Sequence, residues 1–165
     1  MKKTLLILCS SLLFTATTCY WECDTRHQTI KFYNATDYVI YISQNYHYPD
    51  TSLVHERDVS VFTGSYNVEA HSVNEESLNC GRPYEIELGN SEDTLMVFVY
   101  NADTLAFYGW EYVKEHYLIA QRYDLSLGDL QQLNWRLQFP PSPKMQNIKM
   151  WPPYGTYDSL GHLVQ

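Results

Sequence analysis

Cysteine is scarce in this chain, and its spacing argues against a structural metal site. Two of the four cysteines, Cys9 and Cys19, lie close to the start, which leaves Cys23 and Cys80 for the folded part. The sequence has no CxxC motif and no paired Cys/His spacing, so we expect no structural zinc. In an oxidising compartment Cys23 and Cys80 would form a disulfide worth about 4 kcal/mol in the chain-entropy model. Two unpaired thiols remain the alternative.

Catalytic motifs are also missing. The chain has no GxSxG, HExxH, P-loop or GxGxxG pattern, and none of its six histidines is followed by another at i+4. The sequence therefore predicts no catalytic residue, no metal ligand and no cofactor. Glu85 and Glu87 would share one face if they lay on a strand, but a glycosidase needs two carboxyls about 5 to 9 Å apart inside a cleft. An exposed acidic face is the simpler interpretation.

Positive charge is in short supply. The chain has 11 Lys and Arg against 19 Asp and Glu, a formal net charge of -8. Removing Lys2 and Lys3 with a signal peptide would make it -10. Nucleic acid and anionic lipid headgroups are therefore not expected as partners.

A long hydrophobic run is lacking at the start of the chain as well. The apolar stretch from Leu5 to Phe14 spans about 10 residues, too few for a permanent transmembrane helix. The charged start Met1-Lys2-Lys3 and the small residues after the stretch are typical of a secretory signal. We therefore expect residues 1–18 to be a signal peptide and the mature protein to be exported.

The small residues Thr15 to Thr18 lead directly into Cys19. This segment resembles the lipobox of bacterial lipoproteins, in which the cysteine thiol is acylated and becomes the new N-terminus. It departs from the usual pattern, with Ala16 where Leu or Val is standard and Thr18 where Gly or Ala is standard. The resemblance implies a lipid on Cys19, a membrane association only through that lipid, and a periplasmic or outer-membrane location. Ordinary cleavage after Ala16 or Thr18 is the alternative.

What the chain has in abundance is tyrosine. Its 15 Tyr, with 4 Trp and 6 Phe, make 15% of the residues aromatic. Tyrosine fits half-buried strands, and a length under 150 residues after cleavage suits one domain. The sequence therefore predicts a mainly β protein with a single β-rich domain over residues 19–139.

Several runs predict strands. Residues 29–33 and 38–42 read as a hairpin about the turn-forming Asn34 to Asp37. The apolar run 94–100 predicts a strand buried on both faces at the centre of the core, paired with a strand over 105–108. Further strands are expected over residues 59–62, 66–73, 84–88, 118–125 and 135–139.

Two short helices are predicted in the C-terminal half. Apolar residues recur at helical spacing over Trp110 to Tyr117, and Ser126 provides an N-cap for a helix over Ser126 to Asn134. Strands with two short helices predict a small β-sandwich, with the immunoglobulin-like fold as one candidate form.

The last segment, residues 140–165, is rich in proline. Five of the seven prolines fall between Pro140 and Pro153, so we expect an irregular, partly extended tail. Its apolar residues, among them Ile148 and Met150, would cost several kcal/mol to leave in water. The tail is therefore expected to pack on the domain and to form part of its binding surface.

Sequence blocks in the C-terminal third carry a family resemblance. The run DTLMVFVYNADTL over residues 93–105 is followed by RYDLSL over 122–127, Asp129-Leu130 and Leu133-Asn134-Trp135. These blocks resemble an uncharacterised family of small exported lipoproteins of Bacteroidetes. The resemblance implies export and no particular activity.

Three triplets in the chain resemble the Asp-Ser/Thr-apolar acceptor of protein O-glycosylation in that phylum. They would place the modification on Thr94, Thr104 and Ser159. Asp-Thr and Asp-Ser pairs are also ordinary turn formers at strand ends, which is the alternative.

Aromatic residues in loops and in the tail are the candidate ligand contacts, because Tyr and Trp rings can stack on sugars. Trp110 and Trp135 lie on predicted elements and are assigned to the core. We expect a non-enzymatic cell-envelope interaction module that binds a glycan or a protein partner; a structural accessory subunit of an envelope complex and a small hydrolase are the alternatives. The candidate contacts are Tyr46, Tyr48, Trp151, Tyr154 and Tyr157.

Overall fold

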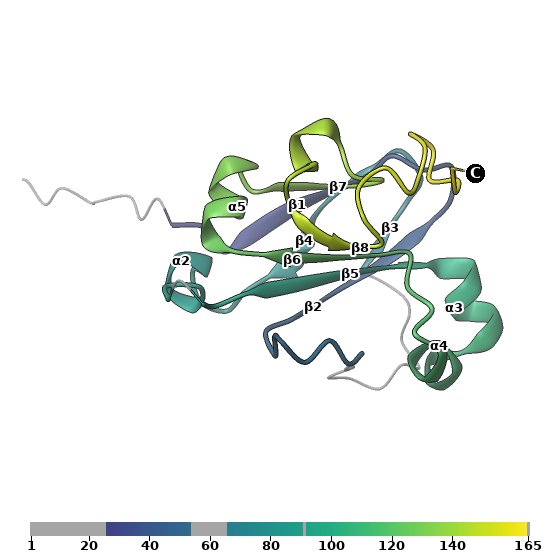
Figure 1. Ribbon diagram of the computed structural model, residues 1–165, viewed down its shortest axis with the longest axis horizontal. Coiled ribbons are helices and arrows are strands. Elements are labelled where there is room, and N and C mark those ends of the chain that lie inside the picture. The colour runs from purple at the N-terminus through teal and green to yellow at the C-terminus, as the bar shows by residue number, and fades with distance from the viewer. Residues whose placement is uncertain (1–25, 54–65, 91, 165) are drawn as a thin grey trace, which may run out of the picture.

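Two β-sheets carry the fold in the computed structural model, which describes residues 26–53, 66–90 and 92–164 (Figure 1). One sheet has three strands in the order β4-β1-β7, and the other has five in the order β3-β2-β5-β6-β8. The protein is therefore mainly β, as predicted. The strands are β1 (Thr29–Asn34), β2 (Ile40–Asn45), β3 (Asn67–Val68), β4 (Val73–Asn79), β5 (Leu95–Asn101), β6 (Gln121–Leu125), β7 (Arg136–Phe139) and β8 (Lys149–Trp151).

Over the described ranges, four α-helices and one 3-10 turn join these strands. They are α2 (Tyr84–Glu87), α3 (Ala102–Tyr108), α4 (Trp110–His116), α5 (Leu127–Gln132) and the turn η2 (Pro143–Met145). The two predicted helices are confirmed as α4 and α5. Ser126 caps α5 as expected, with Asp129 closing a capping box. Over the described residues, no helix has the length and apolar character that crossing a membrane requires.

The core is built around β5, as its apolar sequence predicts. Leu95 to Tyr100 are all buried, and β5 lies between β2 and β6 with antiparallel pairing to both. Val97 and Val99 belong to one apolar cluster with Phe32 of β1 and Phe139 of β7, so the cluster joins both sheets. Each such buried side chain stabilises the fold by about 1.5 to 3 kcal/mol.

The predicted hairpin between residues 29–33 and 38–42 is wrong in its pairing, although both strands exist. β1 lies between β4 and β7 in the three-stranded sheet, while β2 lies between β3 and β5 in the other. The connection is therefore a crossover between sheets. The physical reason is that two of its polar residues, Asn34 and Thr36, are fully buried and bond the surrounding backbone, whereas a hairpin turn would expose them.

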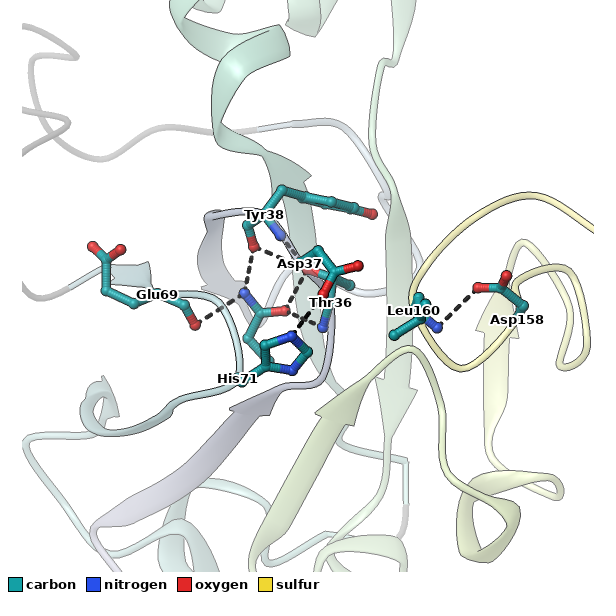
Figure 2. A network of polar contacts seen from close by, with 8 residues as sticks. Thr36, Asp37, Tyr38, Glu69, His71, Asp158 and Leu160 are labelled. Carbon is teal, nitrogen blue, oxygen red and sulfur yellow. Dashed lines mark hydrogen bonds and ion pairs between the residues drawn. The ribbon is translucent and has the colours of Figure 1, made fainter.

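The Asn34 amide holds this crossover together by hydrogen bonds to surrounding residues, of which Figure 2 labels Thr36, Tyr38 and Glu69. Its Nδ2 lies 2.7 to 3.1 Å from the carbonyl oxygens of Tyr38, Val68 and Glu69. Its Oδ1 accepts hydrogen bonds from the backbone N–H and the hydroxyl of Thr36 at 2.9 and 2.7 Å. One side chain thus ties the end of β1 to the start of β2 and the end of β3.

The strand predicted over residues 84–88 is a helix, α2, and with it the prediction that Glu85 and Glu87 share a strand face is wrong. Alternating apolar residues suggested a strand, but the backbone N–H of Ile86 bonds the carbonyl of Pro83 and that of Leu88 bonds the carbonyl of Tyr84. Tyr84 and Leu88, four residues apart, are both buried, and Ile86 is exposed. That is the burial pattern of one helical turn.

The strand predicted over residues 105–108 is also a helix, α3, so it does not pair with β5. Asn101 is an N-cap, because its side-chain oxygen accepts a hydrogen bond from the backbone N–H of Thr104 at 2.9 Å. Residues 101–103 are therefore the start of a helix rather than a link between two paired strands. Another predicted strand, 66–73, is interrupted by a turn at Glu69 to Ser72, which separates β3 from β4.

The tail after Phe139 returns to the domain. β8 pairs antiparallel with β6 at the edge of the five-stranded sheet, and Met145 and Ile148 are buried in the main cluster. Further on, Gly161 sits so close to the crossover that a Cβ there would lie 2.6 Å from Thr36 Cγ2. The predicted strand over 59–62 lies outside the described residues, as do Cys19 and Cys23.

Candidate functional site

The pairing of β8 with β6 brings four side chains together on the outer face of the sheet edge. Arg122 lies opposite Trp151, and Asp124 lies opposite Lys149. Cross-strand partners project to the same face of a sheet, so these four form a small block. The residue between them on β6, Tyr123, points the other way and is fully buried.

Trp151 is the aromatic centre of this block. Its side chain is 46% exposed, although it lies within a strand. Its ring meets that of Tyr117 edge to face, with centroids 5.5 Å apart. Tyr117 is held at the end of α4 in the left-handed conformation, with φ 52°. The strand and the helix end therefore fix the orientation of Trp151.

Asp124 orients the neighbouring cations. Its carboxylate is 1% exposed and accepts hydrogen bonds from Arg122 Nε at 2.8 Å and Nη2 at 3.3 Å, a bidentate pair. Arg122 Nη1 also donates to the Tyr117 hydroxyl at 2.8 Å. Burial lowers the pKa of Arg122, but the hydrogen bonds to Asp124 and Tyr117 raise it further than burial lowers it. The guanidinium therefore stays charged, in a fixed position beside Trp151.

Lys149 joins Tyr48 to the same block. Its ammonium lies 3.9 Å from Asp124 Oδ2, donates a hydrogen bond to the Tyr48 hydroxyl, and lies 4.7 Å from the centroid of the Tyr48 ring. The hydrogen bond to Tyr48 is the main cause that raises the pKa of Lys149. We call these six residues the Trp151 patch: Tyr48, Tyr117, Arg122, Asp124, Lys149 and Trp151.

Of the five predicted aromatic contacts, the structure thus brings Tyr48 and Trp151 together. Tyr157 lies elsewhere: its ring packs against Phe139 at 5.3 Å, and its hydroxyl donates to the Ala120 carbonyl at 2.8 Å. Tyr46 lies near Cys80 and Tyr84; burial and then hydrogen bonding with Cys80 raise its pKa. Tyr154 is 41% exposed on the tail.

Sequence reasoning missed the polar members of the patch. Arg122 and Asp124 are two residues apart on a strand, as are Lys149 and Trp151, and this spacing places each pair on one face. The spacing was readable from the sequence. The pairing of the two strands was not, because residues 149–151 were expected to be irregular.

A second aromatic cluster lies on the exposed sides of α3 and α4. Phe107 is 81% exposed and meets Tyr108 edge to face, with ring centroids 4.8 Å apart. Tyr108 stacks on Tyr112 at 4.8 Å, and Tyr112 stacks on His116 at 3.9 Å. The i, i+4 spacing of these last three was a signal, hidden by the assignment of residues 105–108 to a strand. We call these four residues the aromatic ladder.

The predicted O-glycosylation sites differ in their accessibility. Thr94 directly precedes β5 and is partly buried, and Thr104 lies in the first turn of α3. Ser159 is exposed, in a loop where Asp158 Oδ1 accepts backbone hydrogen bonds from Leu160 and His162, both at 2.9 Å. Modification at each site stays a prediction, and Ser159 offers the most open acceptor.

The Cys23–Cys80 disulfide also stays a prediction, since Cys23 lies outside the described residues. Within the described part of the chain, no group of three His, Cys, Asp or Glu side chains is placed to hold a metal ion. Comparisons with protein-family models, curated proteins and solved structures found no match to this chain.

Proposed function

We propose that this protein is a non-enzymatic binding module of the bacterial cell envelope and that the Trp151 patch binds a glycan. The observation that carries the proposal is a half-exposed tryptophan fixed beside an oriented guanidinium and an ammonium. An aromatic ring can pack on the apolar face of a sugar. Arg and Lys can donate hydrogen bonds to its hydroxyls or to a carboxylate.

The rigidity of the patch favours binding. Asp124 holds Arg122 by two hydrogen bonds, and Tyr117 holds it by a third. Groups fixed before a ligand arrives lose little conformational entropy on binding. Since Lys149 and Trp151 both belong to β8, the proposal also gives the tail its predicted place in the binding surface.

Replacing Trp151 with alanine should weaken glycan binding by at least about tenfold, because the stacking surface is lost. The measurement is affinity electrophoresis in gels that contain xylan, mannan, β-glucan or pectin, with melting temperature as the check on folding. Tyr108→Ala is the matched control, since it removes an exposed aromatic ring of the ladder, outside the patch. Absence of retardation in every gel, or equal retardation of Trp151→Ala, would refute the proposal.

A protein partner is the second candidate, and the aromatic ladder favours it. Because Tyr108 and Tyr112 stack on each other and on His116, their ring faces are already occupied within the ladder. Such a ladder is better suited to packing against apolar side chains than to sugar stacking. If polysaccharide gels retard nothing, crosslinking at Phe107 in envelope extracts distinguishes a protein-binding module from a purely structural subunit.

The location and the finer fold belong to the same proposal. Two sheets that share one apolar cluster, and that lie one above the other in Figure 1, support a β-sandwich. The helices α3 and α4 between β5 and β6 would be an insertion in an immunoglobulin-like version of it.

We expect the mature protein to start at a lipid-modified Cys19 and to be held by it at the periplasmic or outer surface. The reason is the charged start and apolar stretch that precede this cysteine. Mass spectrometry of the mature N-terminus should show diacylglycerol on Cys19, and Cys19→Ala should move the protein from the membrane to the soluble fraction. An unmodified N-terminal peptide from the native protein would contradict this expectation.

A further inference from the structure

The outer face of the three-stranded sheet carries a groove that the Trp151 patch does not include. Its volume is about 640 Å³, within the range of roughly 300 to 1,000 Å³ typical of small-ligand sites. The floor of the groove consists of two rows of side chains that run across the sheet. They lie together because residues paired in register on neighbouring strands project to the same face. In the first row Tyr33 lies between Val73 and Gln138.

The second row is charged. Lys31 lies beside Arg136 in register, and Lys31 Nζ bonds Glu75 Oε1 at 2.6 Å. This ion pair neutralises the charge of Lys31 but not the charge of Arg136. Lys144 of η2 lines the wall of the same groove. Over the described part of the chain, neither Arg136 nor Lys144 forms an ion pair or a side-chain hydrogen bond, so the groove carries two unpaired cations.

This local charge is opposite to that of the whole molecule. The chain has 11 Lys and Arg against 19 Asp and Glu, yet three of these cations and a single carboxylate line the groove. The net charge of the chain repels an anion, whereas the cations of the groove attract it. Apolar surface lies next to the charge: Val73 is 54% exposed although it is a large apolar residue, and Pro143 lines the wall.

We propose that this groove binds a small amphiphilic anion, a molecule with an apolar body and one carboxylate or sulfonate. The apolar body would cover Val73, Tyr33 and Pro143, and the acidic group would lie between Arg136 and Lys144. Both halves of the ligand are needed. Exposed cations alone would bind any anion, and only weakly, while the apolar floor alone would not distinguish a charged ligand from a neutral one.

The test is a matched ligand series on the full mature protein, read by isothermal titration calorimetry. Decanoate should bind at least about tenfold more tightly than decanol, which lacks the charge, and than acetate, which lacks the chain. Anilinonaphthalene sulfonate, an anionic aromatic amphiphile, should compete with decanoate. Equal binding of decanoate and decanol would overturn the proposal, as would acetate binding as tightly as decanoate.

Variants locate the site. Arg136→Gln with Lys144→Gln should weaken decanoate at least about tenfold and leave decanol unchanged, since only the charge contact is removed. Arg82→Gln with Lys114→Gln is the control, because it removes two exposed cations outside the groove. Val73→Asp should abolish decanoate binding by placing a carboxylate on the exposed floor. If the groove variants and the control pair behave alike, binding is unspecific and the proposal fails, whatever the polysaccharide gels show for the Trp151 patch.

Discussion

Asn34→Ala should destabilise the protein by about 3 to 5 kcal/mol, a large part of the 5 to 15 kcal/mol that a domain typically has. The side chain is fully buried and bonds both sides of the crossover between the sheets. Alanine would leave the buried backbone N–H of Thr36 and the carbonyl of Val68 without these partners. Each unsatisfied buried group costs about 1 to 3 kcal/mol. In thermal unfolding followed by circular dichroism, the melting temperature should fall by about 10 °C or more.

Two further variants separate hydrogen bonding from packing. Asn34→Asp nearly preserves the volume, but an ionised carboxylate cannot donate to the carbonyls of Tyr38, Val68 and Glu69; it should therefore be as damaging as alanine. Asn79→Ala is the matched control, a strand asparagine that is exposed, and it should change stability by less than about 0.5 kcal/mol. A stable Asn34→Asp variant would show that donation by the Asn34 amide does not hold the crossover.

Asn34 also shows why the sheet order could not be read from the sequence. Strand propensity located β1, β2 and β5 well, because alternation and apolar runs are local signals. The turn-forming stretch from Asn34 to Asp37 reads equally well as a hairpin turn, and only the long-range bonds to Val68 and Glu69 decide against it. Which strands pair depends on such contacts between residues far apart in the chain.

The helices show the same limit on a smaller scale. Ser126 and Asp129 form a capping box, which is a sequence signature, and α5 was predicted correctly. In α2 and α3 the signal is ambiguous, because four to seven residues are too few to separate a period of 3.6 from a period of 2. The misassigned residues 105–108 then concealed Phe107 and Tyr108 as members of the aromatic ladder.

The candidate site was predictable in part. An exposed role for Trp151 followed from its place in a proline-rich segment, and Tyr48 from its place in a polar loop. Their proximity was not predictable, since Lys149 reaches the Tyr48 hydroxyl across 101 positions of sequence. Asp124 reads as a solvated carboxylate in the sequence, and its burial becomes visible only with β8 beside β6.

Removing residues 140–165 should cost more than about 5 kcal/mol and leave the remaining chain unfolded or melting at least about 15 °C lower. Met145 and Ile148 are buried in the main cluster, each worth about 1.5 to 3 kcal/mol. The edge of β6 would lose the pairing with β8. In addition, the fully buried Gln121 would lose the hydrogen bond that its Nε2 donates to the Pro152 carbonyl at 2.7 Å.

A shorter truncation serves as the graded control. Deleting residues 154–165 keeps η2 and β8 and removes mainly the end loop, whose contacts with the domain include the Tyr157 hydroxyl on Ala120 and the Gly161 backbone beside Thr36. Its expected cost is about 1 to 3 kcal/mol, because one packed ring and its hydrogen bond are lost. Gly161→Ala should disturb the same loop without shortening the chain, since a side chain at φ +85° is strained and its Cβ would lie 2.8 Å from the Tyr38 hydroxyl.

The larger truncation should therefore be far more damaging than the shorter one. Equal melting temperatures for the parent and the chain ending at Phe139 would mean that β8 adds nothing to the fold, and the tail would then be a passive extension.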